Sequence, residues 1–446
     1  MNRKLLFISA FIVICLAPQC TIDQLDDPLD QKLRTTLNKV SPDNDYTHYI
    51  LPESHNLADI PQDEVNNPLT AVKIELGKML FFETGLALAP IHEEGRESYS
   101  CGTCHVPSAC FMPGREQGVA DGGFRFGENG EGREILSVYN EDELDAQGVR
   151  PLAMINLAYV PNTTWNGRFG PGGVNTGTEY AWGEGLEVNF LGYGGLETQN
   201  IEGLRLHRMV VNKDVVDSLG YKQYFDASFP EMDEETRYSE VGASFAISAY
   251  LRSILTNKAP FQQWLKGNDE AMTDPQKRGA LLFYGKALCY RCHKGPALNS
   301  VEFYSVGVKD LYETGNAHAT SIDDPRNLGR GSFTGNPEDN HKFKVPQLYN
   351  MGDVAFFFHG ASQSNLHDVV NYFNDAIPEN PNIPEEQIAV QFHPLYLTHE
   401  EVEDVVEFLK GGLYDPDLDR YVPDAILSGN CFPNNDPASR EDLGCD

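Results

Sequence analysis

Two cysteine pairs, each followed at once by a histidine, are the part of the sequence best suited to chemistry. They read Cys101-Gly-Thr-Cys104-His105 and Cys289-Tyr-Arg-Cys292-His293. With 9 cysteines and 12 histidines in 446 residues, chance would produce only about 0.005 such motifs. Two thiols at this spacing can reach the two vinyl groups of a porphyrin, and the histidine can place its imidazole under the iron. The pattern is the attachment signature of c-type haem, so we expect two covalently bound haems.

The cysteines outside these motifs suggest structural roles. Cys431 and Cys445 lie in a tail rich in Pro, Asn and Asp, where a disulfide that closes a surface loop is expected. Cys110 follows His105 by five residues and precedes Phe111, which favours a buried, inert thiol next to the first haem.

The N-terminus has the pattern of an export signal. Two positive charges within Met1–Lys4 precede an apolar run from Leu5 to Ala17, which is too short for a comfortable membrane span. We therefore expect residues 1–20 to be a signal peptide and the protein to be exported to the periplasm. Cys15 and Cys20 lack the small-residue run that precedes a lipidated cysteine, which leaves a lipid anchor open as the one link to a membrane.

The composition indicates a soluble, acidic, globular protein. The 34 Lys and Arg residues against 66 Asp and Glu residues give a net charge of −32, which repels nucleic acid and anionic membranes. Hydrophobic residues at 41% and aromatic residues at 11% are too abundant for a disordered acidic chain. Nucleic acid is therefore excluded as a partner.

Helical patterns precede each cysteine motif. Asn67-Pro68 is a cap residue followed by proline, and apolar residues continue at helical spacing to Phe82. Thr273-Asp274-Pro275 makes a second start of this kind and leads into residues 278–284. Both segments contain Gly-x-x-Leu-Phe, at 77–81 and 279–283, which is a faint internal repeat. Further helices are predicted within 238–255 and 400–409.

These elements predict a mainly α fold. It would contain two cytochrome c-like helical domains, each with one covalently bound c-type haem, joined by long irregular loops. The predicted segments are an acidic linker or strap (21–65), an N-terminal domain (66–265), a C-terminal domain (266–415) and an irregular acidic tail (416–446). Residues 112–148 and 166–195, rich in Gly, Asn and Glu, are predicted to be loops around the first haem.

Beyond the motifs, the chain resembles the bacterial dihaem cytochrome c peroxidase and MauG family. The matching segments are 76–82, 156–161, 165–168, 196–199, 344–350 and the helical stretch 366–373. The resemblance implies that peroxide reacts at the N-terminal haem and that the C-terminal haem stores electrons. Trp165 matches a tryptophan that carries electrons between the haems in this family. Without the resemblance, a buried core aromatic is the simpler interpretation of Trp165.

The acid–base residues depart from the family pattern. Gln199 matches a family glutamine, but the glutamate expected ten residues later is absent, and the sequence there reads Leu206-His207-Arg208-Met209. We predict that His207 moves the proton and that Arg208 stabilises the leaving hydroxide. The carboxylate alternatives are Glu197 and Glu202.

Two iron-ligand positions of the family are also changed. Asp121 stands where many members have a histidine that ligates the resting iron, so the first haem is expected to have an open sixth site. At the second haem the family ligand aligns with Phe373, which cannot bind iron. Tyr372 is a weak candidate, because adjacent helix residues point about 100° apart. His359 matches a family histidine that is not normally a ligand.

A calcium ion lies between the haems in this family, and its asparagine ligand aligns with Arg150. A fixed guanidinium could replace the charge of the ion. The resemblance therefore disfavours calcium, although Asn156 nearby keeps it open.

Taken together, the resemblance implies an exported peroxidase that reduces hydrogen peroxide to water. Electrons would come from a small donor protein, a c-type cytochrome or a copper protein, which the acidic charge predicts to carry a basic patch. Two alternatives stay open. One is MauG-like oxidation of Tyr or Trp side chains of a protein substrate, and the other is a non-enzymatic dihaem electron carrier.

Overall fold

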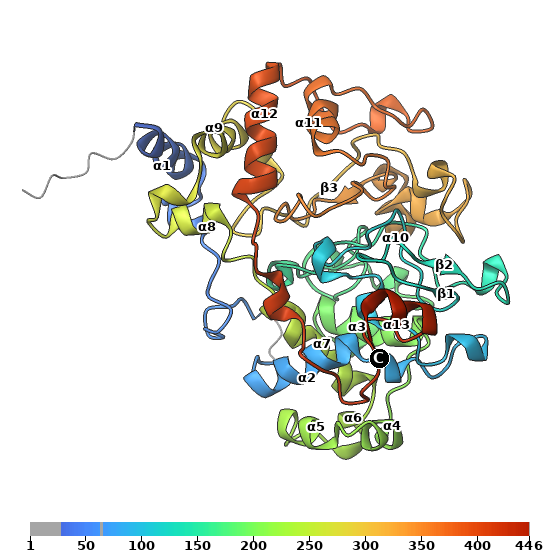
Figure 1. The fold of residues 1–446 in the computed structure, drawn as a ribbon. Helices are drawn as coiled ribbons and strands as arrows, with labels where there is room; N and C mark the ends of the chain where they lie inside the picture. Colours follow the sequence, from blue (N-terminus) through green and yellow to red (C-terminus); the bar gives the residue numbers. More distant parts are fainter. Residues whose placement is uncertain (1–27, 63–65, 446) are drawn as a thin grey trace, which may run out of the picture.

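The computed structural model describes residues 28–62 and 66–445, so the expected signal peptide and its cysteines lie outside the described residues. The fold is mainly helical with little strand (Figure 1). The helices are α1 (Pro28–Val40), α2 (Ala71–Phe82), α3 (Gly195–Leu206), α4 (Lys213–Ser218), α5 (Lys222–Ser228), α6 (Glu234–Arg237), α7 (Glu240–Ser253), α8 (Pro260–Leu265), α9 (Asp274–Phe283), α10 (Gly331–Thr334), α11 (Leu366–Asp375), α12 (His399–Glu407) and α13 (Pro437–Leu443). The short strands β1 (Gly123–Phe124) and β2 (Glu134–Ile135) form one antiparallel pair, and β3 (Phe303–Tyr304) and β4 (Phe343–Lys344) form another.

The same helix crossing occurs in both halves of the chain. In the N-terminal half α2 packs on α7, and in the C-terminal half α9 packs on α12. A Cβ atom at Gly77 would lie 1.9 Å from the carbonyl oxygen of Ala246, and one at Gly279 would lie 1.9 Å from that of Asp404. Only glycine allows the backbones to approach so closely. The faint sequence repeat thus marks an equivalent crossing in each half.

The two helices that precede the motifs begin differently. Thr273 caps α9, which confirms the predicted start, and it forms a capping box with Gln276. The prediction for α2 was wrong, because Thr70 and not Asn67 caps this helix. The side chain of Asn67 is buried and donates a hydrogen bond to Glu197 at 2.7 Å, so it belongs to a buried polar network instead of a helix end. Residues 112–148 and 166–195 are mainly loops with short turns, as predicted, although the first of these ranges also contains the two-residue strands β1 and β2.

The segment expected to be an acidic linker or strap contains helix α1. Leu33 and Leu37 lie one turn apart and are fully buried, and α1 packs against α9 of the C-terminal half (Figure 1). The buried Asp30 accepts hydrogen bonds from Trp264 Nε1 at 2.6 Å and from Lys277 Nζ at 2.9 Å. The N-terminal segment is therefore fastened to the C-terminal half of the chain.

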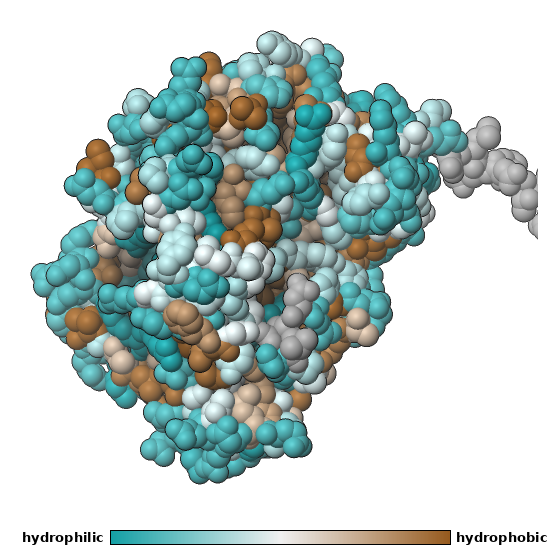
Figure 2. Space-filling view, turned by 180° about the vertical axis from the view of Figure 1, so that it is seen from behind, coloured by the Kyte–Doolittle hydropathy of each residue, from teal (hydrophilic) through white to brown (hydrophobic). Residues whose placement is uncertain are grey.

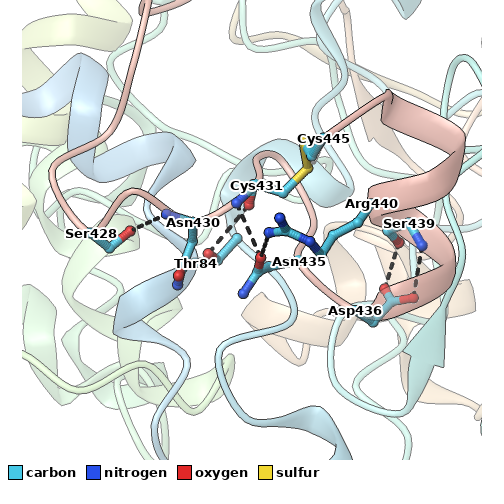
Figure 3. The surroundings of a disulfide bond; sticks show 9 residues. All are labelled: Thr84, Ser428, Asn430, Cys431, Asn435, Asp436, Ser439, Arg440 and Cys445. Carbon is cyan, nitrogen blue, oxygen red and sulfur yellow. Dashed lines mark hydrogen bonds between the residues drawn. A yellow bond between two sulfur atoms is a disulfide. The ribbon is translucent and has the colours of Figure 1, made fainter.

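The tail is not irregular throughout, which corrects the prediction for residues 416–446. Asp436 caps α13 by accepting from the backbone N–H of Ser439 at 3.0 Å, and a proline follows at the first helical position. Cys431 and Cys445 form the expected disulfide, which encloses this helix (Figure 3).

This disulfide-closed tail packs on the N-terminal half, beside the first cysteine motif. The carbonyl oxygen of Pro433 accepts hydrogen bonds from Ser100 Oγ at 2.9 Å and from Thr103 Oγ1 at 3.3 Å. Asp442 accepts from the backbone N–H groups of Phe126 and Gly127 at 3.0 and 3.1 Å. The C-terminal segment thus covers the half of the molecule in which the first motif lies.

The face shown in Figure 2 is covered mainly by hydrophilic residues, with hydrophobic residues in small groups. Among residues 28–62 and 66–445, no helix combines the length and the hydropathy that a membrane span needs.

Candidate functional site

The first cysteine motif lies in the wall of a cavity of about 240 Å³. Cys101 and Cys104 are free thiols, and burial raises the pKa of each to about 12. The Nδ1 atom of His105 lies 3.0 Å from the carbonyl oxygen of Phe111, which orients the ring and leaves Nε2 for a metal. Burial lowers the pKa of His105 to about 4, so the imidazole is neutral, which is the form that binds a metal.

The second motif lies in a larger cavity of about 490 Å³. Cys289 and Cys292 are free thiols as well. The Nδ1 atom of His293 lies 3.0 Å from the carbonyl oxygen of Leu298 and 3.1 Å from that of Pro346. Burial lowers the pKa of His293 to about 4. Each cavity thus combines two free thiols, an oriented neutral imidazole and mostly hydrophobic walls, and this combination fits a covalently attached haem.

A single wall separates the two cavities. Trp165, Phe343 and Lys344 line both of them. The backbone N–H of Lys344 donates to the carbonyl oxygen of Trp165 at 2.7 Å. Lys344 is almost fully buried, and this burial lowers its pKa to about 7. The predicted relay residue Trp165 is therefore placed between the two candidate haem sites.

A histidine–aspartate pair lies in the wall of the first cavity. His207 follows α3 directly, and its Nδ1 atom lies 2.7 Å from Oδ2 of Asp145. Burial alone would lower the pKa of His207, but the charge of Asp145 and its hydrogen bond outweigh burial and raise this pKa above its ordinary value. Because Asp145 holds the proton on Nδ1, Nε2 is the ring nitrogen that can accept a proton. Gln199 and Glu202 of α3 line the same cavity.

Sequence reasoning found His207 and missed Asp145. The two residues are 62 positions apart, and Asp145 lies in a loop without periodic pattern. The one signal in the sequence is that a histidine near a redox site needs a partner that orients it, and this does not show which carboxylate is that partner.

The structure contradicts the predicted role of Arg208. Its guanidinium forms an ion pair with Asp121, and Arg208 is not part of the cavity wall. Asp121 is fully buried and also accepts a hydrogen bond from the hydroxyl group of Tyr139. A buried carboxylate needs a cation close to it, so Arg208 stabilises the loop of Asp121 instead of facing a substrate. Asp121 itself does not line the cavity.

The two carboxylate alternatives have different surroundings. Glu197 is fully buried and pairs through both oxygens with Arg252, with a distance of 2.7 Å between Arg252 Nη2 and Glu197 Oε2. It does not reach the cavity, so its role is structural. Glu202 does line the cavity, and burial raises its pKa. Of the two alternatives, Glu202 alone lies where an acid could act.

Comparison with known proteins agrees with this geometry. The family model described as di-haem cytochrome c peroxidase matches residues 71–270, a stretch that holds the first motif, Trp165 and His207. Residues 71–270 therefore belong to the di-haem cytochrome c peroxidase and MauG family. The name of this family implies two haems, and the chain has two cavities that fit them.

The relatives include peroxidases and MauG proteins. The chain is 26% identical over 370 residues to cytochrome-c peroxidase IdrP1 of Pseudomonas sp. (strain SCT), which covers 79% of this chain and 82% of the relative. It is 25% identical over 353 residues to methylamine utilization protein MauG of Methylorubrum extorquens, which covers 77% of this chain and 79% of the relative. Among solved structures, a MauG-like protein associated with microbial copper homeostasis has the same fold, with a TM-score of 0.56, 22% identity, and coverage of 82% of this chain and 95% of that one.

The structure does not bring Tyr372 to the second cavity. The hydroxyl group of Tyr372 donates to the carbonyl oxygen of Val306 at 2.6 Å, and the residue is not part of the cavity wall. Its neighbour Phe373 lines the cavity, as the register of α11 requires. His359 also lines the cavity, but its Nε2 atom lies 3.0 Å from Asp310 Oδ1, which engages that nitrogen.

Arg150 occupies the position where the family resemblance places calcium. Its buried guanidinium donates hydrogen bonds to three carbonyl oxygens, those of Pro113 at 2.8 Å, Glu116 at 3.3 Å and Arg115. The guanidinium also lies over the ring of Phe356, 5.6 Å from its centre. These carbonyl oxygens already accept hydrogen bonds from the fixed guanidinium cation, so they are not available as ligands for a calcium ion beside it. The residues at this position therefore do not fit calcium.

Proposed function

We propose that this protein is a peroxidase with two covalently attached c-type haems, which reduces hydrogen peroxide to water with electrons from a small redox protein. Cys101 and Cys104 would attach the first haem and His105 would ligate its iron. Cys289, Cys292 and His293 would do the same for the second. The family membership and the two matched cavities support this proposal.

The observation that carries the proposal is the pair of His207 and Asp145 in the same cavity as His105. Haem bound there would supply the iron at which the O–O bond of peroxide is cleaved. His207 Nε2 would take the proton from the peroxide oxygen nearer the iron and return it to the leaving oxygen. Asp145 keeps the ring in the tautomer that can do so and stabilises it when it is protonated. Gln199 and Glu202 would provide polar contacts to the leaving oxygen.

Reduction of one peroxide to two waters takes two electrons and two protons. We infer that the electrons enter at the second haem and pass through the wall that contains Trp165, which lines both cavities. The net charge of −32 favours a donor with a basic patch. The export signal proposed from residues 1–20 would bring the enzyme to the periplasm.

Steady-state peroxide reduction by His207→Ala tests the proposal. We expect turnover to fall by on the order of 10²-fold or more, the usual scale for a positioned acid–base group, while both haems stay attached. His367→Ala is the matched control, because His367 pairs with Glu403 on the surface and lines neither cavity. A loss below about threefold would remove His207 from the mechanism and direct attention to Glu202.

A MauG-like oxidation of protein side chains is the second candidate, since MauG proteins are among the relatives. The source of the electrons distinguishes the two candidate functions. A peroxidase consumes two equivalents of reduced donor per peroxide, whereas a MauG-like enzyme consumes peroxide without donor and leaves an oxidised Tyr or Trp in a substrate protein.

A further inference from the structure

The second cavity has a wall in which the expected iron ligand is missing. His293 approaches from the side of α9, where its ring lies 6.4 Å from that of Phe283. Phe373 of α11 belongs to another part of the wall and has no atom that can bind iron. Any sixth ligand must therefore come from a different segment.

Residues 389–397 form a segment that backbone hydrogen bonds hold over the cavity beside Phe373. The backbone N–H of Ala389 donates to the carbonyl oxygen of Ser305 at 2.8 Å, and that of Leu395 donates to the carbonyl oxygen of Asn374 at 3.0 Å. Between these points the ring of Phe392 lies 5.8 Å from the ring of Phe373. The segment thus follows the end of α11 and covers the cavity beside Phe373.

His393 follows Phe392 directly in this segment and lines the cavity. Its Nδ1 atom lies 3.2 Å from the carbonyl oxygen of Pro394. This is the same kind of contact that orients His105 and His293, and it leaves Nε2 as the nitrogen available to a metal. His393 is exposed, so packing in a hydrophobic core does not explain its presence in the wall.

The other side chains in the wall of this cavity that could ligate iron are engaged or lie outside the segment 389–397. His359 is bound by Asp310, and Lys344 Nζ donates to the carbonyl oxygen of Asn162 at 2.8 Å. Met112 and Met351 also line this cavity, and both pack in the main hydrophobic core, outside residues 389–397. His341 has the same kind of contact as His393, with Nδ1 3.2 Å from the carbonyl oxygen of Asn327, but it lies outside the segment that packs on Phe373.

We propose that His393 supplies the sixth ligand to the iron of the second haem, so that this haem is coordinated by His293 and His393. The proposal rests on the two haems proposed above and not on peroxidase activity. Histidine in place of methionine lowers the reduction potential of a c-type haem, so the second haem would hold electrons less tightly than a histidine–methionine haem.

Electron paramagnetic resonance of the ferric, full-length holoprotein tests this assignment. We expect His393→Ala to contain one fewer low-spin haem per chain than the wild type, and one more high-spin haem. Added imidazole should restore the lost low-spin signal, because it can occupy the vacated position. His341→Ala is the matched control and should leave the spectrum unchanged. Haem content, measured on the same samples, shows that both variants are folded and loaded.

Three outcomes would overturn the assignment. One is an unchanged low-spin signal in His393→Ala, another is loss of that signal in His341→Ala, and the third is a high-spin second haem in the wild type. Each is read from the spectrum alone. A protein that reduces no peroxide could still show the low-spin signal that is lost in His393→Ala. Failure of the proposed function and failure of the ligand assignment are therefore distinguishable.

Discussion

Trp165 donates the hydrogen of its indole Nε1 to the backbone carbonyl oxygen of Arg150, at 2.6 Å. The backbone N–H of Arg150 in turn donates to the carbonyl oxygen of His359 in the second cavity, at 2.7 Å. The indole is therefore fixed by Arg150, and the guanidinium of Arg150 is held by the loop that follows the first motif. One rigid connection runs from the first cavity through Trp165 to the second.

Trp165→Phe should slow electron transfer between the haems while peroxide still binds at the first. Phenylalanine keeps most of the packing but is much harder to oxidise and cannot donate to Arg150. Stopped-flow spectra of the reduced protein mixed with peroxide should show the second haem oxidised more slowly than in the wild type. Wild-type rates at both haems would exclude a relay through this residue.

Asp145→Asn should move the pH dependence of turnover. The neutral form of His207 is the base, so wild-type activity should fall as the pH drops through the raised pKa of His207. Asparagine removes the negative charge and leaves burial, which lowers that pKa, so the acidic limb of the profile should shift to lower pH. Turnover at neutral pH should fall about tenfold or more, because the tautomer is no longer enforced. An acidic limb at the wild-type pH would show that another group controls it.

Glu197→Gln should destabilise the N-terminal half without a direct effect on chemistry. The change leaves the nearly buried Arg252 without its anion, and breaking a buried ion pair in this way costs about 3–5 kcal/mol. Urea unfolding followed by circular dichroism gives the free energy. Glu302→Gln is the control, because its pair with Lys294 is exposed and should cost at most about 1 kcal/mol. Equal losses in the two variants would contradict a structural role for Glu197.

The variant with both Cys431→Ser and Cys445→Ser should be less stable by about 3 kcal/mol, the loop-entropy value for a loop of roughly this length. The bond joins residues 14 apart in sequence. Hydrogen exchange should increase around Ser100 and Phe126, which the tail contacts, and much less in α12. Uniform exchange across the molecule would show that the tail does not support the N-terminal half specifically.

The sequence predicts most strongly what depends on short-range spacing. His105 and His293 follow from the motifs, and the capping box of α9 follows from Thr273 and its neighbours. Contacts between distant loops cannot be predicted from residue spacing. For this reason Asp145 was missed and Arg208 was assigned to the wrong site. The helix α13 could have been found, because Asp436 is a good cap residue and Pro437 follows it at the first helical position, a signal of the kind that marks the start of α9.

The arrangement of the chain ends has a consequence for biogenesis. Among the described residues the first helix is α1, which finds its partner Lys277 only after more than half of the chain has been synthesised. The C-terminal tail closes over Ser100 and Thr103 near the first motif. Until then Cys101 and Cys104 lack this cover, so the haem attachment proposed above would meet less obstruction before the tail packs. For the same reason, cutting the chain between its halves would take a stabilising segment away from each, and neither half should behave as an independent cytochrome.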